Sequence, residues 1–198
     1  LKPPCGDIIL TGDDHGGVQF PAQTGHQVAA VDLADAGDGG GLAEAKKFAR
    51  ENNLDDVKFP GYVRGDKKIC HLLDNDIFLQ PTYHPEGLPC AMLEAMACGL
   101  AVITSNAGGI PDFFENERMG FMLDTLEPEA YADKLLELVS NPEKIREIYD
   151  AYRDNILLFM FRYAYYPNVN GSWGCEKIIR YIPIGQEVIN AGYQTIPA

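Results

Sequence analysis

Residues 66–104 read DKKICHLLDNDIFLQPTYHPEGLPCAMLEAMACGLAVIT, and this stretch decides the fold class. Its apolar spacing and its Gly and Pro residues predict four elements in order: a helix capped by Asp66 and running through Leu73, a buried strand over 77–79, a helix over 89–98 that Gly99 ends, and a strand over 101–104. Short buried strands that alternate with helices are typical of βαβ units. The stretch therefore predicts an α/β protein with a parallel sheet.

The same alternation continues on both sides of this stretch. Apolar runs and turn residues predict further strands over 7–11, 27–33, 57–59 and 120–123. Helical spacing predicts helices over 42–53 and 125–139, and a further helix that begins at 141–143. We therefore expect a Rossmann-like parallel sheet with helices on both faces.

The texture of the sequence changes after about residue 150. Apolar and aromatic residues alternate with period two over 157–165, which indicates a strand, and a Gly- and Asn-containing loop over 168–174 follows. We expect residues 1–150 to form one domain and residues 151–198 to form an appendage.

Composition and charge exclude several classes of protein. The 198 residues carry 16 Lys and Arg against 29 Asp and Glu, a net charge of −13, which argues against binding to nucleic acid. Five cysteines without a C-x-x-C pair argue against a disulfide framework or a structural zinc site. The longest apolar run, 156–161, is too short to span a membrane, and no signal peptide is recognised, so we expect a cytoplasmic protein.

The segment that carries chemistry is His84 to Gly99, HPEGLPCAMLEAMACG. It places Glu86 in a loop after a strand and Glu94 inside the next helix, with seven residues between them. In open α/β sheets, ligands bind at the carboxyl ends of strands, where helix starts present free N–H groups to phosphates. An ionised carboxylate accepts two vicinal hydroxyls, so a nucleotide sugar would suit both features.

This segment resembles the donor-binding, C-terminal half of the retaining, nucleotide-sugar glycosyltransferases of the GT-B fold, group 1. The matching residues read EGLPCAMLEAMACGLAVITSNAGGIPD, from Glu86 to Asp112, and residues 57–63 resemble the strand and turn beside the nucleotide base. The resemblance covers roughly residues 42–150. It implies that the chain is one lobe of a GT-B enzyme of polysaccharide or glycoconjugate biosynthesis.

The resemblance also implies a role for each matching residue. Glu86 would be the catalytic residue that holds hydroxyls of the transferred sugar, and Glu94 would hold the ribose diol. The amides of Gly87, Leu88, Pro89 and Cys90 would face the sugar or diphosphate, with base contacts near Tyr62 and Val63. No metal or other cofactor is expected. The implied partners are a nucleotide-sugar donor and a carbohydrate or glycolipid acceptor, and a lipid-linked acceptor would bring peripheral contact with a membrane.

The sequence also departs from the family. An Arg and a Lys that family members place on the diphosphate have no counterpart, because Lys2 is the only basic residue among the first 41. The acceptor-binding half is missing upstream, so the chain looks incomplete and a second lobe or chain is expected. Residues 165–177 resemble the first strand, glycine-rich loop and helix of that half, which would then follow in reversed order. The alternative is that residues 173–181 form the family's closing helix, which crosses back to the other domain. A binding or regulatory module without catalysis is therefore the rival interpretation.

Simpler explanations compete with each candidate. Glu86 and Glu94 also fit the description of two solvated acids near a helix start, or of a pair of carboxylates that catalyses hydrolysis. The Asp13-Asp14-His15 run is better explained by a solvated turn than by a metal site. Cys90 and Cys98 are expected to pack in the motif helix.

Overall fold

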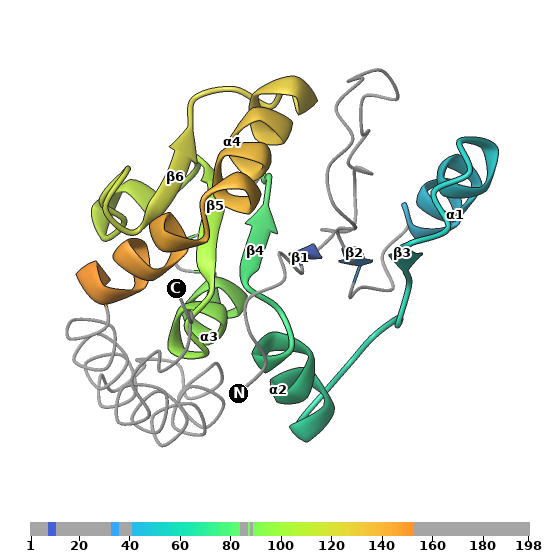
Figure 1. Cartoon of the computed structure of the whole chain (residues 1–198), viewed down its shortest axis with the longest axis horizontal. Coiled ribbons are helices and arrows are strands. Elements are labelled where there is room, and N and C mark those ends of the chain that lie inside the picture. Colours follow the sequence, from blue (N-terminus) through green and yellow to red (C-terminus); the bar gives the residue numbers. More distant parts are fainter. Residues whose placement is uncertain (1–7, 11–32, 36–40, 84–86, 88, 153–198) are drawn as a thin grey trace.

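A six-stranded sheet in which every neighbouring pair is parallel organises the computed structural model of the chain, which describes residues 8–10, 33–35, 41–83, 87 and 89–152 (Figure 1). The strands are β1 (Ile8–Leu10), β2 (Leu33–Asp35), β3 (Val57–Lys58), β4 (Ile77–Gln80), β5 (Ala101–Ser105) and β6 (Gly120–Leu123). Their order across the sheet is β3-β2-β1-β4-β5-β6. Strand order reverses between β1 and β4, which is where open α/β sheets form their ligand crevice.

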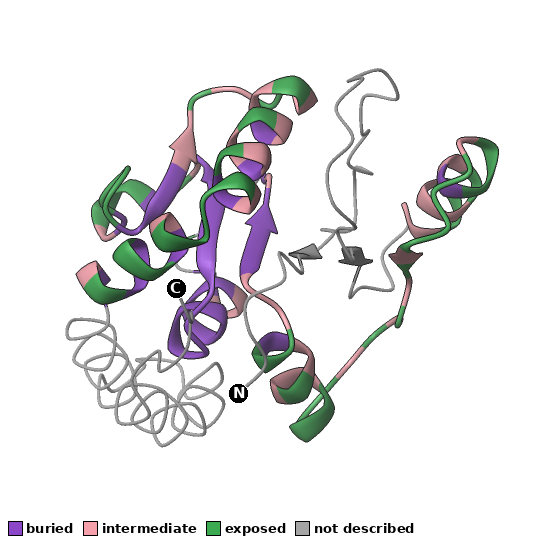
Figure 2. Cartoon of the chain, viewed as in Figure 1, coloured by how far each residue is buried: buried purple, intermediate pink, exposed green. Residues whose placement is uncertain are grey.

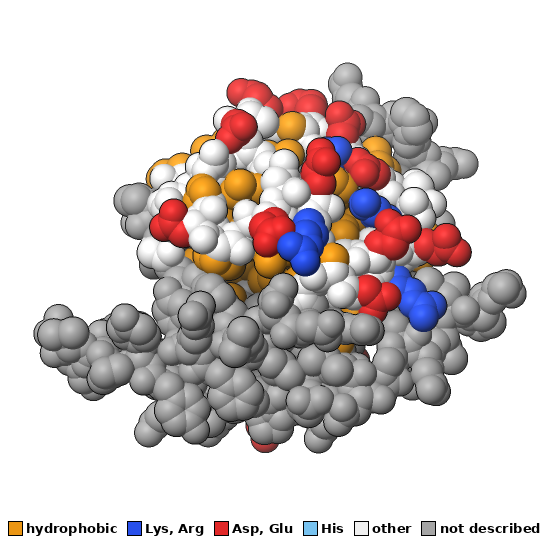
Figure 3. All heavy atoms as spheres, turned by 90° about the vertical axis from the view of Figure 1, so that its left-hand side faces the viewer, with side chains coloured by type: hydrophobic (Ala, Val, Ile, Leu, Met, Phe, Trp, Pro, Cys, Tyr) orange, Lys and Arg blue, Asp and Glu red, His pale blue; other side chains and the backbone are white. Residues whose placement is uncertain are grey.

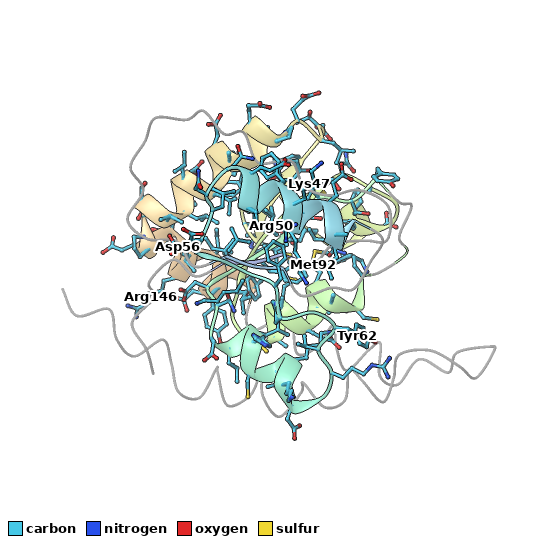
Figure 4. The ribbon with its side chains drawn as sticks, turned by 90° about the vertical axis from the view of Figure 1, so that its right-hand side faces the viewer. Lys47, Arg50, Asp56, Tyr62, Met92 and Arg146 are labelled. Carbon is cyan, nitrogen blue, oxygen red and sulfur yellow. The ribbon has the colours of Figure 1, made fainter. Side chains whose placement is uncertain are left out.

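Helices connect these strands and cover both faces of the sheet. They are α1 (Leu42–Glu51), α2 (Asp66–Leu73), α3 (Cys90–Ala97) and α4 (Pro128–Ser140), with a 3-10 turn over Ile110–Asp112. In Figure 4, α1 and α4 lie on one side of the sheet, and α2 and α3 lie on the other. A last helical segment begins at residue 142 and runs through 152. The predicted α/β class and parallel sheet are confirmed.

The core lies between α3, α4 and the central strands. All residues of β4 and β5 are buried, as are six of the eight residues of α3, whose apolar surface is not confined to one side (Figure 2). Strands buried on both faces carry continuous apolar runs rather than an alternation. Tyr152 fixes the last helical segment to this core, because its hydroxyl donates a 2.8 Å hydrogen bond to the Leu100 carbonyl.

The helix ends explain most of the predicted boundaries. Gly99 has φ +90° and ends α3, as a left-handed residue after a helix commonly does. Pro128 opens α4 because proline suits the first helical position, so this helix begins three residues later than predicted. The other helices and the strands at 57, 77, 101 and 120 lie within two residues of their predicted bounds.

Two predictions are wrong in detail. Asp66 is the first helical residue of α2 rather than its cap; Gly65, with φ +56°, occupies the cap position, and no side chain caps the helix. The strand predicted over 27–33 ends at Asp35, two residues later than predicted; of its predicted residues only Leu33 is described, because residues 27–32 lie outside the described residues. The predicted strand over 157–165 and nearly all of the 151–198 appendage also lie outside them.

Candidate functional site at the carboxyl edge of the sheet

The loops that follow β4 and β5 are joined directly by Thr82 and Ser105. The Thr82 amide donates a 2.9 Å hydrogen bond to the Ser105 hydroxyl, and this hydroxyl in turn donates to the Thr82 carbonyl. Just before these two residues in the chain, the Thr104 hydroxyl of β5 donates a 3.1 Å hydrogen bond to the carbonyl of Gln80, the last residue of β4. All these groups are buried, so the edge where the predicted site lies is held by hydrogen bonds away from water.

The same two loops approach closely at Gly87 and Gly109. A Cβ atom added to Gly109 would lie 2.3 Å from the Gly87 carbonyl oxygen, whereas one added to Gly87 would meet nothing within 4 Å. Gly109 is the second glycine of the pair 108–109 in the loop that follows β5, and this close approach gives a physical reason for glycine there. Because Gly109 has no side chain, the loop after β5 can lie against the Gly87 carbonyl in the loop that leads to α3.

The start of α3 has features that favour anions. Pro89 occupies the cap position in an extended conformation, and no side chain caps the first turn. The first-turn N–H groups of a helix lack intrahelical partners and carry partial positive charge, and α3 has no acidic residue in its first turn to offset it. Pro89 is buried, Cys90 is partly buried and Gly87 is exposed.

Glu94 is the predicted site residue that the structure describes most completely. It lies in the fifth position of α3 with its side chain 3% exposed, and its Oε2 accepts a hydrogen bond and ion pair from Lys68 Nζ of α2. Burying an isolated carboxylate is costly, and an opposite charge offsets that cost. The solvated-acid explanation for Glu94 is therefore wrong.

The electrostatic influence of Glu94 extends one turn along α3 to Cys98. Burial, and then the negative charge of Glu94, raise the pKa of the Cys98 thiol from 9.0 to about 12, while Lys68 acts in the opposite direction. A thiol with such a pKa stays protonated near neutral pH. Cys98 is a packing residue, as expected from the sequence.

The residues predicted beside the base follow β3. Tyr62 is 54% exposed, and the Arg64 guanidinium carbon lies 4.4 Å from its ring centroid. Figure 4 shows Tyr62 on the same side of the sheet as α2 and α3. Val63, the residue between Tyr62 and Arg64, is partly buried. Glu86 and Leu88 lie outside the described residues. The structure thus gathers Gly87, Pro89, Cys90 and Glu94 around one helix start, with Tyr62 and Val63 on the segment that precedes α2.

Two polar residues of this region were missed by the sequence analysis. Lys68 has no motif around it, and its role depends on contact with a residue 26 positions away. Gln80, at the carboxyl end of β4, is 3% exposed, and no described residue donates a hydrogen bond to its Oε1. A Gln directly after the apolar run 77–79 is the one signal that could have pointed to it.

Residues 8–10, 33–35, 41–83, 87 and 89–152 contain no group of three or more His, Cys, Asp or Glu arranged to hold a metal ion. No helix within those same ranges is long and apolar enough to cross a membrane.

Comparison with known proteins identifies the family. The model of the glycosyl transferases group 1 family matches residues 24–155, about two thirds of the chain, and the chain belongs to this family. It is 34% identical over 102 residues to the amylovoran biosynthesis glycosyltransferase AmsK of Erwinia amylovora, a match that covers 48% of this chain and 25% of that protein. It is 30% identical over 125 residues to a GDP-mannose-dependent phosphatidylinositol monomannoside mannosyltransferase of Mycobacterium tuberculosis, covering 60% and 32%. The chain thus spans a quarter to a third of the length of these relatives.

Solved structures show the same fold. The C-terminal domain of a group 1 glycosyl transferase, LpcC of Francisella tularensis, superposes with a TM-score of 0.66 at 21% identity, covering 80% of this chain and 87% of that domain. HepE of Anabaena, solved with UDP-glucose, superposes with a TM-score of 0.61 at 17% identity, covering 93% and 49%. The fold is therefore the Rossmann-like lobe of a GT-B glycosyltransferase.

Proposed function

We propose that this chain is the donor-binding lobe of a retaining glycosyltransferase that moves a sugar from a nucleoside diphosphate to an acceptor hydroxyl. The observation that carries the proposal is the buried Glu94 carboxylate, one helical turn from an uncapped helix start at the carboxyl edge of the sheet. Membership of the group 1 family and the GT-B lobe fold support the same reaction class.

Each part of the site would have a distinct task. Glu94 would accept hydrogen bonds from the two ribose hydroxyls, and the start of α3 would stabilise the negative charge that grows on the departing diphosphate. Glu86 would hold hydroxyls of the sugar, and the acceptor hydroxyl would attack on the face that the diphosphate leaves. The lobe would work by charge stabilisation and positioning, without a metal ion.

The acceptor is proposed by class only. The relatives include enzymes named for amylovoran biosynthesis and for phosphatidylinositol monomannoside, so a polysaccharide or a glycolipid would fit. Because the chain spans only part of those relatives, acceptor binding is assigned to a second lobe. A lipid-linked acceptor would bring that assembly to a membrane surface.

A ligand panel tests the donor site. Thermal unfolding of the chain should be measured with UDP, GDP and ADP and their sugar derivatives, since a ligand that binds the folded state raises its stability. We expect one base to raise the Tm, and Glu94→Gln to remove that shift. Glu129→Gln, an exposed acid in the first turn of α4, is the matched control and should keep it. Equal Tm values with every nucleotide would contradict the proposal.

A second candidate is a module that binds nucleotide sugars without transferring them. The observation that favours it is the absence of Lys and Arg from residues 3–41, where the family resemblance implies two basic side chains on the diphosphate. Transfer of sugar to any acceptor by this chain would reject this candidate. Donor binding without transfer, even with an added acceptor lobe, would favour it.

A further inference from the structure

Lys68 and Glu94 form a link between two successive βα units. Lys68 is the third residue of α2, and Glu94 is the fifth residue of α3, so both lie close to the starts of their helices. Helices in βαβ units run opposite to their strands, which places these starts toward the carboxyl edge of the sheet. The pair therefore lies at the same edge as the proposed donor site.

Burial makes the pair asymmetric. The Glu94 side chain is 3% exposed, whereas the Lys68 side chain is 31% exposed and keeps access to water. A buried carboxylate without a partner is costly, because it has lost its hydrogen bonds to water. An ammonium group on Oε2 replaces one of those hydrogen bonds and fixes the direction in which the carboxylate points.

The ion pair leaves room for a ligand. An ionised carboxylate has about four lone-pair positions, and Lys68 uses one of them on Oε2. Within the described part of the chain, no other side chain donates a hydrogen bond to Glu94. Cys98 is the neighbouring titratable group on α3, and its high pKa keeps it neutral, so it adds no competing charge.

We infer that Lys68 is a positioning residue that fixes the orientation of the Glu94 carboxylate, so that this carboxylate accepts hydrogen bonds from the 2′ and 3′ hydroxyls and selects ribose over sugars that lack them. The inference rests on the proposed donor site and deepens it. In this inference Lys68 acts through Glu94, to which its ammonium group donates a hydrogen bond, rather than directly on the diphosphate.

The test compares ribonucleotides with their 2′,3′-dideoxy counterparts. Calorimetric Kd values for UDP, GDP and ADP and for the dideoxy forms give a ratio that reports the two hydroxyl contacts alone. Hydrogen bonds to a charged acceptor predict that wild-type protein prefers the ribose form by about tenfold or more. Lys68→Met, which removes the charge and keeps most of the length of the side chain, should bring that ratio near one and leave the dideoxy affinity unchanged.

Two further variants control this test. Lys68→Arg keeps a cation at the position and should restore most of the preference. Lys67→Met removes a charge from the neighbouring, exposed lysine of α2 and should change nothing. A Lys68→Met protein that is merely unfolded would lose dideoxy binding and its helical circular dichroism together, and these two measurements identify that case.

Each outcome has a different meaning. A ratio that Lys68→Met leaves intact overturns the inference and leaves the donor site standing. Equal losses for ribose and dideoxy forms, in a folded Lys68→Met protein, overturn it too and place Lys68 on the diphosphate. If the wild-type chain binds no nucleoside diphosphate, the proposed function fails and the inference fails with it.

Discussion

The hydroxyl of Ser105 lies between the amide and the carbonyl of Thr82, and it joins the carboxyl ends of β4 and β5 just before both site loops begin. Ser105→Ala would leave a buried amide and a buried carbonyl without this partner. Unsatisfied buried groups cost about 1–3 kcal/mol, so we expect a loss of that size in the free energy of unfolding, measured in urea. Ser140→Ala, at an exposed helix end, should cost much less. Equal losses would show that the link is unimportant.

Gly109→Ala should disturb the site more than the core. The new methyl would need to displace the Gly87 carbonyl, which lies 2.3 Å from its position, and overpacking of this kind typically costs about 1–3 kcal/mol. Gly87→Ala is the matched control for stability, because a methyl group there meets nothing within 4 Å. The Tm of the two variants decides the matter: an unchanged Tm for Gly109→Ala would mean that the two loops separate freely.

Tyr152→Phe tests how the last helical segment is held. The Tyr152 hydroxyl donates to the Leu100 carbonyl at 2.8 Å in the buried core, so its removal should lower the free energy of unfolding by about 1–3 kcal/mol. Tyr62→Phe removes a hydroxyl from an exposed ring and should have little effect on urea unfolding. If both substitutions cost the same, the hydrogen bond is not what attaches this segment.

Stability should fall as pH rises above about 9. The folded state holds the Cys98 proton up to a pKa of about 12, whereas an ordinary thiol loses it near 9.0, so the folded state binds more protons over that interval. Its stabilising contribution is fully present below pH 9 and is lost as the pH rises toward 12, with a slope of up to about 1.4 kcal/mol per pH unit. Burial raises the pKa of Tyr131 too, and this acts in the same direction.

Urea unfolding of wild type and Cys98→Ala between pH 7 and 11 isolates the thiol. The wild-type midpoint should fall more steeply than that of the variant, which has no thiol to ionise. Parallel curves would show that Cys98 does not titrate as its surroundings imply.

The charge distribution indicates that the proposed donor site would rely on local groups. Figure 3 shows a face of the described chain on which acidic side chains outnumber basic ones, in keeping with the net charge of −13. Such a surface does not attract a diphosphate over long distances. The fixed dipoles at the start of α3 are local, and they act at the edge where the loops converge.

Local patterns predicted most of the fold but little of the site's electrostatics. The run 77–79, the helix before Gly99 and the strand at 101–104 each carry their own signal, and all three are confirmed. The Lys68–Glu94 pair carries none, because it depends on two helices packing side by side across 26 residues. The cap of α2 is Gly65 rather than the predicted Asp66. Its φ of +56° belongs to the turn that leads from β3, which the helical pattern of the sequence does not show. The roles of all the predicted site residues stay predictions, and Glu86 and Leu88 also lie outside the described residues.

Calorimetric titration of the purified chain with UDP, GDP and ADP, repeated with Glu94→Gln, tests the central claim most directly. The account predicts saturable binding of at least one of these diphosphates by the wild-type chain and at least a tenfold weaker affinity, by order of magnitude, in the folded Glu94→Gln variant. Binding that Glu94→Gln leaves unchanged, or no binding by the wild-type chain, would contradict the assignment of a nucleotide-sugar donor site to this lobe.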